Sequence, residues 1–348
     1  MRIGSVGYAT RQGLGTLLKN AFDGGLVTDP AVLRHGSYTT HMEWYPEGTL
    51  ELVSRPFNGP SVDAWLEPLD WVLFWETPFD WAFPDYCRAR GKKTALVTMF
   101  EWFPRHPVHT FDRPIAPSLL DRDLIPGSIY LPIPLQERPW WPRTKARRFL
   151  HNGGHLGYHE HKGTRQILQA IRHVTKPLDL LIRVQPGAEG PFRRMCREER
   201  VPLPDGHNKF EFTSPFGMRV TIEVGEFAGP DLYPPDRDVF LMAEKYNGES
   251  LPLKEARASG MLVVTSDRYP MNTWLDRRYL ILVKGYHTTR VGGPYLEFQE
   301  AEVDPVVVAA TMDAIFDADV TDYSLSALPW VEENSWKNLL PKWIEVLS

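Results

Sequence analysis

The sequence predicts an α/β protein with two Rossmann-like domains, and three observations support this prediction. Short apolar runs such as DWVLFW (Asp70–Trp75) and DVFLM (Asp238–Met242) alternate with helical patterns, as buried parallel strands and crossover helices do. This alternation stops at a proline-rich segment near residue 140 and then begins again. The chain of 348 residues is long for one domain and suits two.

The composition is that of a globular protein, with 43% hydrophobic and 24% charged residues. The sequence contains no run of 18 apolar residues and no signal-peptide pattern, so we expect a cytoplasmic protein without membrane insertion. Cys87 and Cys196 lie too far apart for a CxxC motif, which argues against a disulfide framework or a zinc site. The net charge of −5 argues against a protein that coats nucleic acid. Nothing in the sequence indicates the oligomeric state.

The first half begins with a predicted strand at Arg2–Val6 and a helix at Thr16–Phe22. The loop between them contains Gly13 and Gly15, whose spacing matches neither GxGxxG nor GxxxxGK. Further strands are predicted at Asp70–Trp75, Thr94–Phe100 and Ser128–Ile133, with a helix at Pro84–Arg90. Residues 29–68 have weak periodicity and give no clear prediction.

Residues 138–147 are predicted to be a linker between domains 1–137 and 148–334. The surrounding segment QERPWWPRTKARR has no periodicity and contains five basic residues, one acid and two tryptophans, Trp140 and Trp141. Basic residues that alternate with aromatic residues suit a nucleic-acid or other anionic acceptor. A solvated hinge between domains explains the same residues.

The second half begins with a strand at Arg148–Asn152 and a helix from Thr164. Strands are predicted at Leu178–Val184, Val220–Val224, Asp238–Met242, Met261–Thr265 and Tyr279–Val283, and helices at Asp304-Pro305 and at Ser335–Leu347. Between the strands Asp238–Met242 and Met261–Thr265, Ser250 is predicted to cap a helix that Gly260 ends. The start of a helix at the carboxyl end of a parallel strand favours phosphate binding, because unpaired N–H groups and the helix dipole both face the ligand.

The segment Asn247–Ser266 reads NGESLPLKEARASGMLVVTS. It resembles the nucleotide-sugar motif E-G-x-x-L-P-x-x-E-A-x-A-x-G-x-P-V-V-x-S of retaining GT-B glycosyltransferases of family 4. In that family the second Glu holds the ribose hydroxyls, a role that the resemblance assigns to Glu255. The first Glu, near the donor sugar, is Asn247 here, and Glu249 can replace it only if the loop is repositioned. The remaining residues of this loop that the resemblance assigns to donor binding are Gly248, Ser250 and Leu251.

The segment after Arg148 resembles the part of the family in which Arg and Lys grip the donor diphosphate. Lys162 matches the Lys, whereas His155 occupies the Arg position. Arg165, one turn into the next helix, is a candidate for the missing guanidinium. A lysine beside a helix N-terminus is also a sensible anion clamp on electrostatic grounds. We therefore expect Lys162, Asn247 and Glu255 to be the catalytic residues.

The resemblance implies the GT-B arrangement, in which two domains face one another across a cleft. It implies a nucleoside-diphosphate sugar as co-substrate in the second domain, an acceptor in the first, retention of anomeric configuration, and no required metal or cofactor. It also implies that the C-terminal helix 335–348 packs back on the first domain. Gly13 and Gly15 would then touch donor and acceptor, although a tight turn without ligand explains them equally well.

Acceptor contacts are expected from Glu101, Trp102 and His106, because they follow the strand Thr94–Phe100 and open α/β sheets bind ligands at that end. A solvated proline-rich loop is the alternative. Phage-encoded members of the family glycosylate hydroxylated or hypermodified bases in DNA. The Trp- and Arg-bearing segments 99–109 and 138–148 suit such an acceptor by stacking a flipped base and following phosphates.

Three other functions remain open at this point. The acceptor can be a saccharide or a small molecule. Asn247 and His155 stand where the family has Glu and Arg, which suits a nucleotide-sugar-binding protein without catalysis. A Rossmann oxidoreductase would use Gly7, Gly13 and Gly15, but no acidic residue follows them at the required distance.

Overall fold

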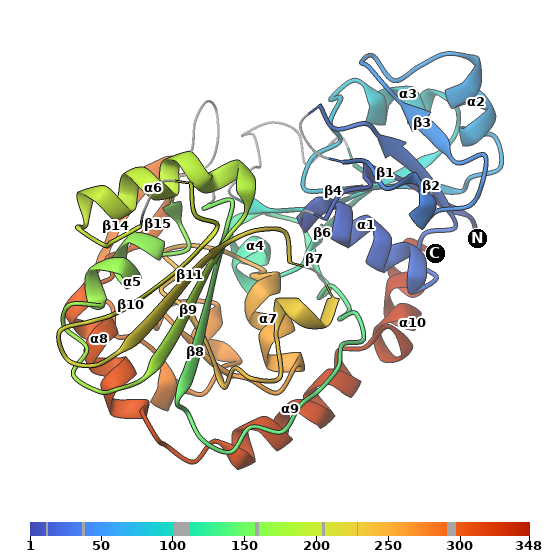
Figure 1. Cartoon of the computed structure of the whole chain (residues 1–348). Helices are drawn as coiled ribbons and strands as arrows, with labels where there is room; N and C mark the ends of the chain where they lie inside the picture. Colours follow the sequence, from blue (N-terminus) through green and yellow to red (C-terminus); the bar gives the residue numbers. More distant parts are fainter. Residues whose placement is uncertain are drawn as a thin grey trace. The chain divides into compact units, whose positions relative to one another are not determined.

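The computed structural model describes residues 1–11, 13–36, 39–100, 111–156, 160–203, 206–227, 229–290 and 297–348. These residues form two compact units. The first unit contains Met1–Gln136 and Glu332–Ser348, and the second contains the described residues from Glu137 to Val331. The segment 138–147, which the sequence suggests as a linker, thus lies within the second unit. Figure 1 labels the elements of both units.

The first unit is built on a seven-stranded parallel sheet with the order β3-β2-β1-β4-β5-β6-β7. Its strands are β1 (Ile3–Tyr8), β2 (Asp29–Leu33), β3 (Leu50–Leu52), β4 (Trp71–Trp75), β5 (Lys93–Val97), β6 (Arg113–Ala116) and β7 (Ile129–Tyr130). Its helices are α1 (Gly13–Asp23), α2 (Pro60–Leu66), α3 (Phe83–Ala89), α4 (Leu119–Leu124) and α10 (Trp336–Leu347). Every residue of β4 is buried, as expected for a central strand that is covered on both faces.

The C-terminal helix α10 packs within the first unit through two tryptophans. Trp343 is fully buried, its ring lies 6.0 Å from that of Trp75, and its Nε1 donates to the carbonyl of Pro132 at 3.1 Å. Trp336 donates to Oδ1 of Asn20 on α1 at 2.7 Å. Two large aromatic side chains therefore hold this distant end of the chain against the sheet.

The second unit has a six-stranded sheet with the order β10-β11-β9-β8-β12-β13, in which only the β10–β11 pair is antiparallel. Its strands are β8 (Arg148–Gly154), β9 (Asp179–Val184), β10 (Lys209–Thr213), β11 (Arg219–Val224), β12 (Val239–Met242) and β13 (Leu262–Thr265). A separate antiparallel pair is formed by β14 (Tyr286–Arg290) and β15 (Glu297–Ala301). The helices are α5 (Thr164–Ala170), α6 (Glu189–Glu198), α7 (Leu251–Ala258), α8 (Pro305–Ile315) and α9 (Thr321–Glu333), the last of which continues into the first unit.

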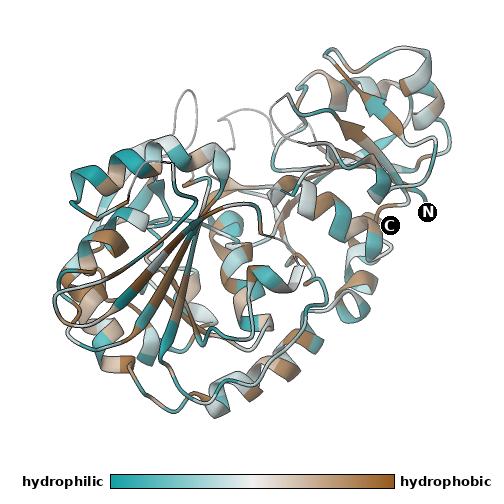
Figure 2. Ribbon diagram, in the orientation of Figure 1, coloured by the Kyte–Doolittle hydropathy of each residue, from teal (hydrophilic) through white to brown (hydrophobic). Residues whose placement is uncertain are grey.

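Alternate residues of these strands belong to two hydrophobic cores, which lie on opposite faces of the sheet. Phe149 belongs to the core that includes α5, α6 and α8, whereas Leu150 belongs to the core that includes α7. Figure 1 shows α5 and α8 on one side of this sheet and α7 on the other, and Figure 2 shows the strands as predominantly hydrophobic. A sheet that is buried on both faces explains the continuous apolar runs in the sequence.

The α/β class with two parallel-sheet domains is confirmed, and one predicted strand is wrong. Tyr279–Val283 does not form a strand: Arg277–Tyr279 is a 3₁₀ turn, and Ile281 makes a single bridge to Ser266. Leu280 and Ile281 are nevertheless buried, one in each core. The apolar run therefore reflects burial at the sheet edge rather than strand pairing. No helix within the described ranges has the length and apolar character needed to cross a membrane.

Candidate functional site

The sheet of the second unit has a topological switch point between β8 and β12. From β8 the chain passes through α5 to β9 on one side, and from β12 it passes through α7 to β13 on the other. Because these helices cover opposite faces, the two loops diverge at the carboxyl ends of the strands. Open α/β sheets bind ligands at such points. The β8–α5 and β12–α7 loops therefore delimit the candidate site.

These two loops are fixed against each other by backbone contacts. The N–H of Lys245 donates to the carbonyl of His161 at 2.7 Å. Gly163 has φ +71°, and a Cβ at this position would lie 2.0 Å from the carbonyl oxygen of Ala243. Glycine is needed here for two reasons: the φ angle is positive, and the close approach of the Ala243 carbonyl leaves no room for a side chain.

His151 on β8 links strand β12 to the start of helix α5. It is fully buried, with Nδ1 2.9 Å from the carbonyl oxygen of Leu241 and Nε2 2.8 Å from Oγ1 of Thr164. Since a carbonyl only accepts, Nδ1 carries the proton and Nε2 accepts from the threonine hydroxyl. Burial lowers the pKa of His151 to about 4, so the ring is neutral at physiological pH. This histidine is structural rather than a metal ligand.

We predict that Gly163→Ala destabilises the protein by about 1–3 kcal/mol, because the new Cβ is strained at positive φ and collides with the Ala243 carbonyl. Gly190→Ala is the matched control, because Gly190 lies in helix α6 and a Cβ at this position would meet nothing within 4 Å. Urea unfolding of both variants measures the difference. Equal unfolding free energies would contradict the proposed role of the close approach.

Lys162 lies at the switch point as a cation without a matching anion. A Cβ on Gly154, which has φ +59°, would lie 2.7 Å from the Lys162 Nζ, so the ammonium lies directly over this glycine at the end of β8. No carboxylate forms an ion pair with it among the described residues. Burial lowers the pKa of Lys162, and the charge of Glu244 opposes this shift. The ammonium is thus partly dehydrated and able to gain from an anionic ligand.

A buried ion pair shapes the β12–α7 loop. The carboxylate of Glu244, which is fully buried, accepts from Nη2 of Arg268 at 2.8 Å. Arg268 is only 2% exposed, and it also donates to the carbonyls of Glu244 at 3.2 Å and Asn247 at 2.9 Å. Burial raises the pKa of Glu244 although Arg268 opposes the shift, so the ion pair does not fully offset the cost of dehydration. Its main effect is to hold the loop in one conformation.

Asn247 and Ser250 both bind within this loop. Asn247 Nδ2 donates to Oε1 of Glu244 at 3.0 Å, and its Oδ1 accepts from the N–H of Ser250 at 2.8 Å. Ser250 occupies the N-cap position of α7, but the predicted capping bond is absent. Its backbone is left-handed, with φ +44°, and its hydroxyl donates to Glu244 at 3.0 Å instead. The Ser250 hydroxyl therefore binds the buried Glu244 carboxylate instead of capping α7 as the sequence predicts.

The start of α7 presents backbone donors. The N–H groups of Gly248, Glu249 and Leu251 have no acceptor among the described residues. The Glu249 carboxylate is 3% exposed and is held by Lys254 Nζ at 2.6 Å, with burial raising its pKa. Its second oxygen has no partner within the described structure. Glu249 is therefore engaged beside α7 and does not take the place of the missing motif Glu in this conformation.

Glu255 lies on α7 with two polar partners. Its carboxylate accepts from the guanidinium of Arg138 and from the hydroxyl of Tyr233 at 2.9 Å. Arg138 also lies over the Tyr233 ring, 5.4 Å from its centroid. The Arg138 and Glu255 side chains are 11% and 15% exposed. A ribose diol that binds Glu255 would join or replace these contacts.

Arg165 and His155 differ in their surroundings. Both terminal nitrogens of Arg165 bind carboxylates of Glu198 and Glu199, at 2.7 and 2.6 Å, so its guanidinium is already neutralised. We therefore leave Arg165 out of the site that we propose. His155 follows Gly154 directly at the carboxyl end of β8.

The two glycines of the first unit have different environments. A Cβ on Gly15 would lie 2.1 Å from the carbonyl oxygen of Thr10, which explains why α1 carries glycine there. A Cβ on Gly13 meets nothing within 4 Å. The predicted acceptor residues Glu101, Trp102 and His106 lie outside the described residues.

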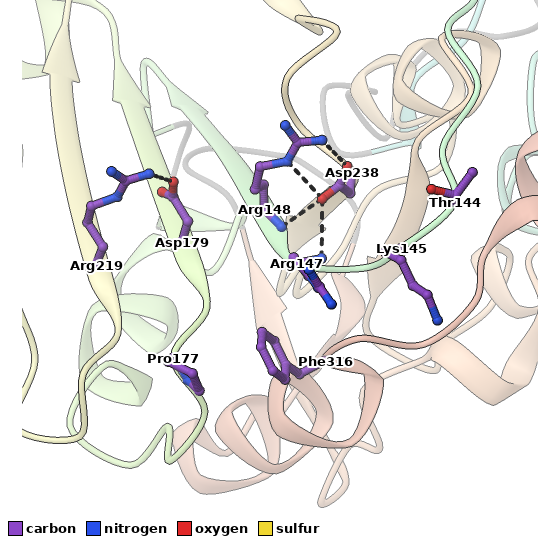
Figure 3. Close-up of a pocket in the computed structure, with 9 residues that line it drawn as sticks. All are labelled: Thr144, Lys145, Arg147, Arg148, Pro177, Asp179, Arg219, Asp238 and Phe316. Carbon is purple, nitrogen blue, oxygen red and sulfur yellow. Dashed lines mark hydrogen bonds and ion pairs between the residues drawn. The ribbon is translucent and has the colours of Figure 1, made fainter.

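A pocket of about 630 Å³ lies at the amino end of the second-unit sheet, away from the switch point (Figure 3). Its arginines are paired with carboxylates: Arg148 binds Asp238 at 2.7 Å, and Arg219 binds Asp179. Arg147 binds Asp317 at 2.6 Å. The first two pairs link strand ends, and the amino end of a parallel sheet is not where such folds bind ligands. In the part of the chain that the structure describes, no group of three or more His, Cys, Asp or Glu side chains is arranged to hold a metal ion.

Known structures with the same arrangement of elements are glycosyltransferases. AviGT4, a glycosyltransferase involved in avilamycin A biosynthesis, has a TM-score of 0.56 and 16% identity over 100% of this chain and 97% of its own. Sucrose-phosphate synthase from Thermosynechococcus elongatus has a TM-score of 0.59 and 12% identity over 99% and 98%. The chain has the GT-B fold. No protein-family model and no curated protein sequence matches it.

Two further GT-B structures match over a smaller share of their length. TarM has a TM-score of 0.54 and 12% identity over 80% of this chain, which spans only 54% of TarM. The pneumococcal O-GlcNAc transferase GtfA, solved with UDP and GlcNAc, has a TM-score of 0.52 and 13% identity over 82% of this chain and 59% of its own. The fold is shared, while the sequences have diverged almost completely.

Proposed function

We propose that this protein is a retaining glycosyltransferase that uses a nucleoside-diphosphate sugar. The observation that carries the proposal is the Lys162 ammonium, which lies over Gly154 at the switch point of the second unit and has no carboxylate partner among the residues that the structure describes. An unpaired, partly dehydrated cation costs free energy in the folded protein, and a bound diphosphate removes that cost. The similarity of residues 247–266 to the family 4 motif supports both the nucleotide-sugar donor and retention.

In this proposal the donor lies along the start of α7. Lys162 binds the diphosphate, and the free N–H groups of Gly248, Glu249 and Leu251 donate to it. Glu255 holds the ribose hydroxyls from one turn further along α7. Asn247 lies nearest the sugar in this proposal, but its amide binds Glu244 and the N–H of Ser250, and it offers no carboxylate.

During transfer the acceptor oxygen forms a bond to the anomeric carbon, while the bond from that carbon to the phosphate oxygen breaks. The departing nucleoside diphosphate gains negative charge and takes the proton of the acceptor hydroxyl. Lys162 and the backbone N–H groups stabilise this charge, which is greatest in the transition state. The proposal does not fix the acceptor class, and a hydroxylated base in DNA is one of the acceptors to be tested.

The experiment is nucleotide release from UDP-, GDP- and ADP-sugars, with neutral saccharides or hydroxymethylated DNA as acceptors. We expect release from one donor, an increase with one acceptor class, and a loss of activity of at least about tenfold in Glu255→Gln, because a charged hydrogen bond to ribose is lost. Glu333→Gln on α9 is a control at an exposed carboxylate.

Each outcome has a distinct meaning. Release in the presence of hydroxymethylated DNA alone identifies a DNA-modifying enzyme. Thermal stabilisation by a sugar nucleotide without any release identifies a protein that binds nucleotide sugars but does not catalyse transfer. The existing hydrogen bonds of Asn247 and Glu255 are consistent with that outcome. Neither release nor stabilisation by any of the donors overturns the proposal.

A further inference from the structure

The first unit has its own switch point, between β1 and β4. The chain passes from β1 through α1 to β2 on one side, whereas β4 is followed by β5 on the other. The register pairs Val6 with Phe74. Tyr8 is the last residue of β1 and Glu76 directly follows β4, so both stand at the carboxyl ends of these two neighbouring strands. These are the positions at which a parallel sheet presents side chains to a ligand.

Glu76 is held in an unusual conformation at this point. Its φ is +62°, and Phe79 three residues later has φ +60°. The backbone is held there by bonds from the N–H of Glu76 to the carbonyl of Val97 at 2.8 Å and from Thr77 to Trp75 at 2.6 Å. Left-handed backbone at residues other than glycine is costly and concentrates at functional sites. The turn therefore directs the Glu76 side chain at some cost to stability.

The carboxylate of Glu76 has no hydrogen bond or ion pair among the described residues. Burial, with a smaller contribution from the charge of Asp121, raises the pKa of Glu76 to about 7. Asp121 itself is fully buried and accepts from the N–H of Phe100 at 2.7 Å. Glu76 thus differs from its neighbour: it is a mostly buried polar group for which the described residues supply no partner.

Aromatic rings gather at the end of β1. The Tyr8 ring lies 4.9 Å from that of Phe79 and 4.8 Å from that of His35, in edge-to-face arrangements. The Tyr8 hydroxyl has no hydrogen-bond partner in the described part of the chain. The switch point therefore combines apolar ring surface with a free carboxyl and a free phenol.

We propose that Tyr8 and Glu76 form a binding site for a neutral, hydroxyl-rich ring, namely an uncharged saccharide that serves as the acceptor. Sugar hydroxyls donate to the carboxylate, and the C–H faces of the ring pack on the aromatic side chains. An anionic ligand would face the carboxyl groups of Glu76 and Asp121 and is disfavoured there. The charge of Arg55 lowers the pKa of Tyr8 but does not contribute to the pKa shift of Glu76. The role as acceptor rests on the proposed glycosyltransferase function, whereas the binding site itself does not.

The first measurement is saturation-transfer NMR of the full-length protein with methyl α-glucoside, methyl α-galactoside and methyl α-mannoside, their 6-phosphates, and hydroxymethylated DNA. We expect binding of at least one neutral glycoside and weaker or no binding of the phosphates. Glu76→Gln and Tyr8→Ser are expected to weaken this binding about tenfold or more, because each removes a contact to the sugar. Glu67→Gln, at an exposed carboxylate of the same unit, is the matched control.

Sugar-nucleotide binding, measured on the same variants, separates the two proposals. Unchanged donor affinity in Glu76→Gln with loss of glycoside binding supports the inference. Glycoside binding that depends on Glu76 in a protein that binds no sugar nucleotide retains the site and overturns the glycosyltransferase. Equal glycoside binding by wild type and both variants, preference for the phosphates or DNA, or no binding of any neutral glycoside overturns the inference.

Discussion

Lys162→Met is expected to weaken binding of the donor nucleotide sugar by about 10- to 100-fold, because a charge-assisted bond to phosphate is lost. The same change is expected to increase the free energy of unfolding. Methionine has a similar length and buries readily, whereas the wild-type ammonium is dehydrated and has no carboxylate partner among the described residues. Affinity and stability therefore move in opposite directions. Isothermal titration with the donor and urea unfolding measure the two effects.

The pH dependence gives this prediction a second test. Because burial lowers the pKa of Lys162 below its ordinary 10.5, the folded protein binds this proton less tightly than the unfolded chain. Wild-type stability should therefore gain from Lys162 as pH rises from the folded pKa towards 10.5, and Lys162→Met should lack that gain. Lys176→Met is the control, at an exposed lysine of the same unit. A loss of stability in Lys162→Met together with unchanged donor affinity would show that Lys162 is structural.

Arg268→Met is expected to cost about 3–5 kcal/mol of stability at neutral pH, because it leaves the Glu244 carboxylate buried and unpaired. It is also expected to reduce donor affinity, since the carbonyls of Glu244 and Asn247 lose the donor that fixes the loop. The double variant Glu244→Gln/Arg268→Met should lose less than the sum of the single variants, because removing both charges leaves neither unpaired. Urea unfolding of the four proteins completes the cycle.

Arg278→Met provides a control for the same residue type. Arg278 is 76% exposed and pairs with Asp276 at 2.5 Å, so its loss should cost close to zero. The cost of Arg268→Met should fall in acid, because Glu244, whose pKa burial already raises, becomes protonated and neutral. Similar costs for the two arginines, or a cost that grows as pH falls, would contradict the role given to the buried pair.

Much of the fold could be predicted because parallel strands that are covered on both faces need continuous apolar runs. Trp71–Trp75 and Leu262–Thr265 are such runs, and both are strands. Local rules also predicted α8, where Asp304 accepts from the N–H of Val306 as a helix cap should. The strands β2 and β3 escaped prediction because short strands among prolines carry little periodic signal.

Most of the side-chain contacts in the candidate site could not be predicted from the sequence. The motif resemblance pointed to Lys162, Asn247 and Glu255, but it gave no reason to select Glu244, Arg268, Arg138 or Tyr233. Arg268 meets Glu244 across 24 positions, and Arg138 meets Glu255 across 117. Such pairings depend on how strands and loops are brought together, and no local pattern encodes them. A charged residue directly after an apolar run is a weak signal, and both Glu244, after Val239–Ala243, and Glu76, after Trp71–Trp75, carry it.

By itself, the sequence determined many of the strands and helices, that the chain is α/β, and that one segment resembles a nucleotide-sugar motif. These are properties of neighbouring residues, because periodic burial and turn chemistry act over a few positions. Only the tertiary structure decided which side chains are already engaged. It joins Arg165 to Glu198 and Glu199, leaves Lys162 without an anion among the described residues, and places Tyr8 and Glu76 at the carboxyl ends of neighbouring strands. Burial and pairing are set by the folded environment, and they distinguish a free functional group from a structural one.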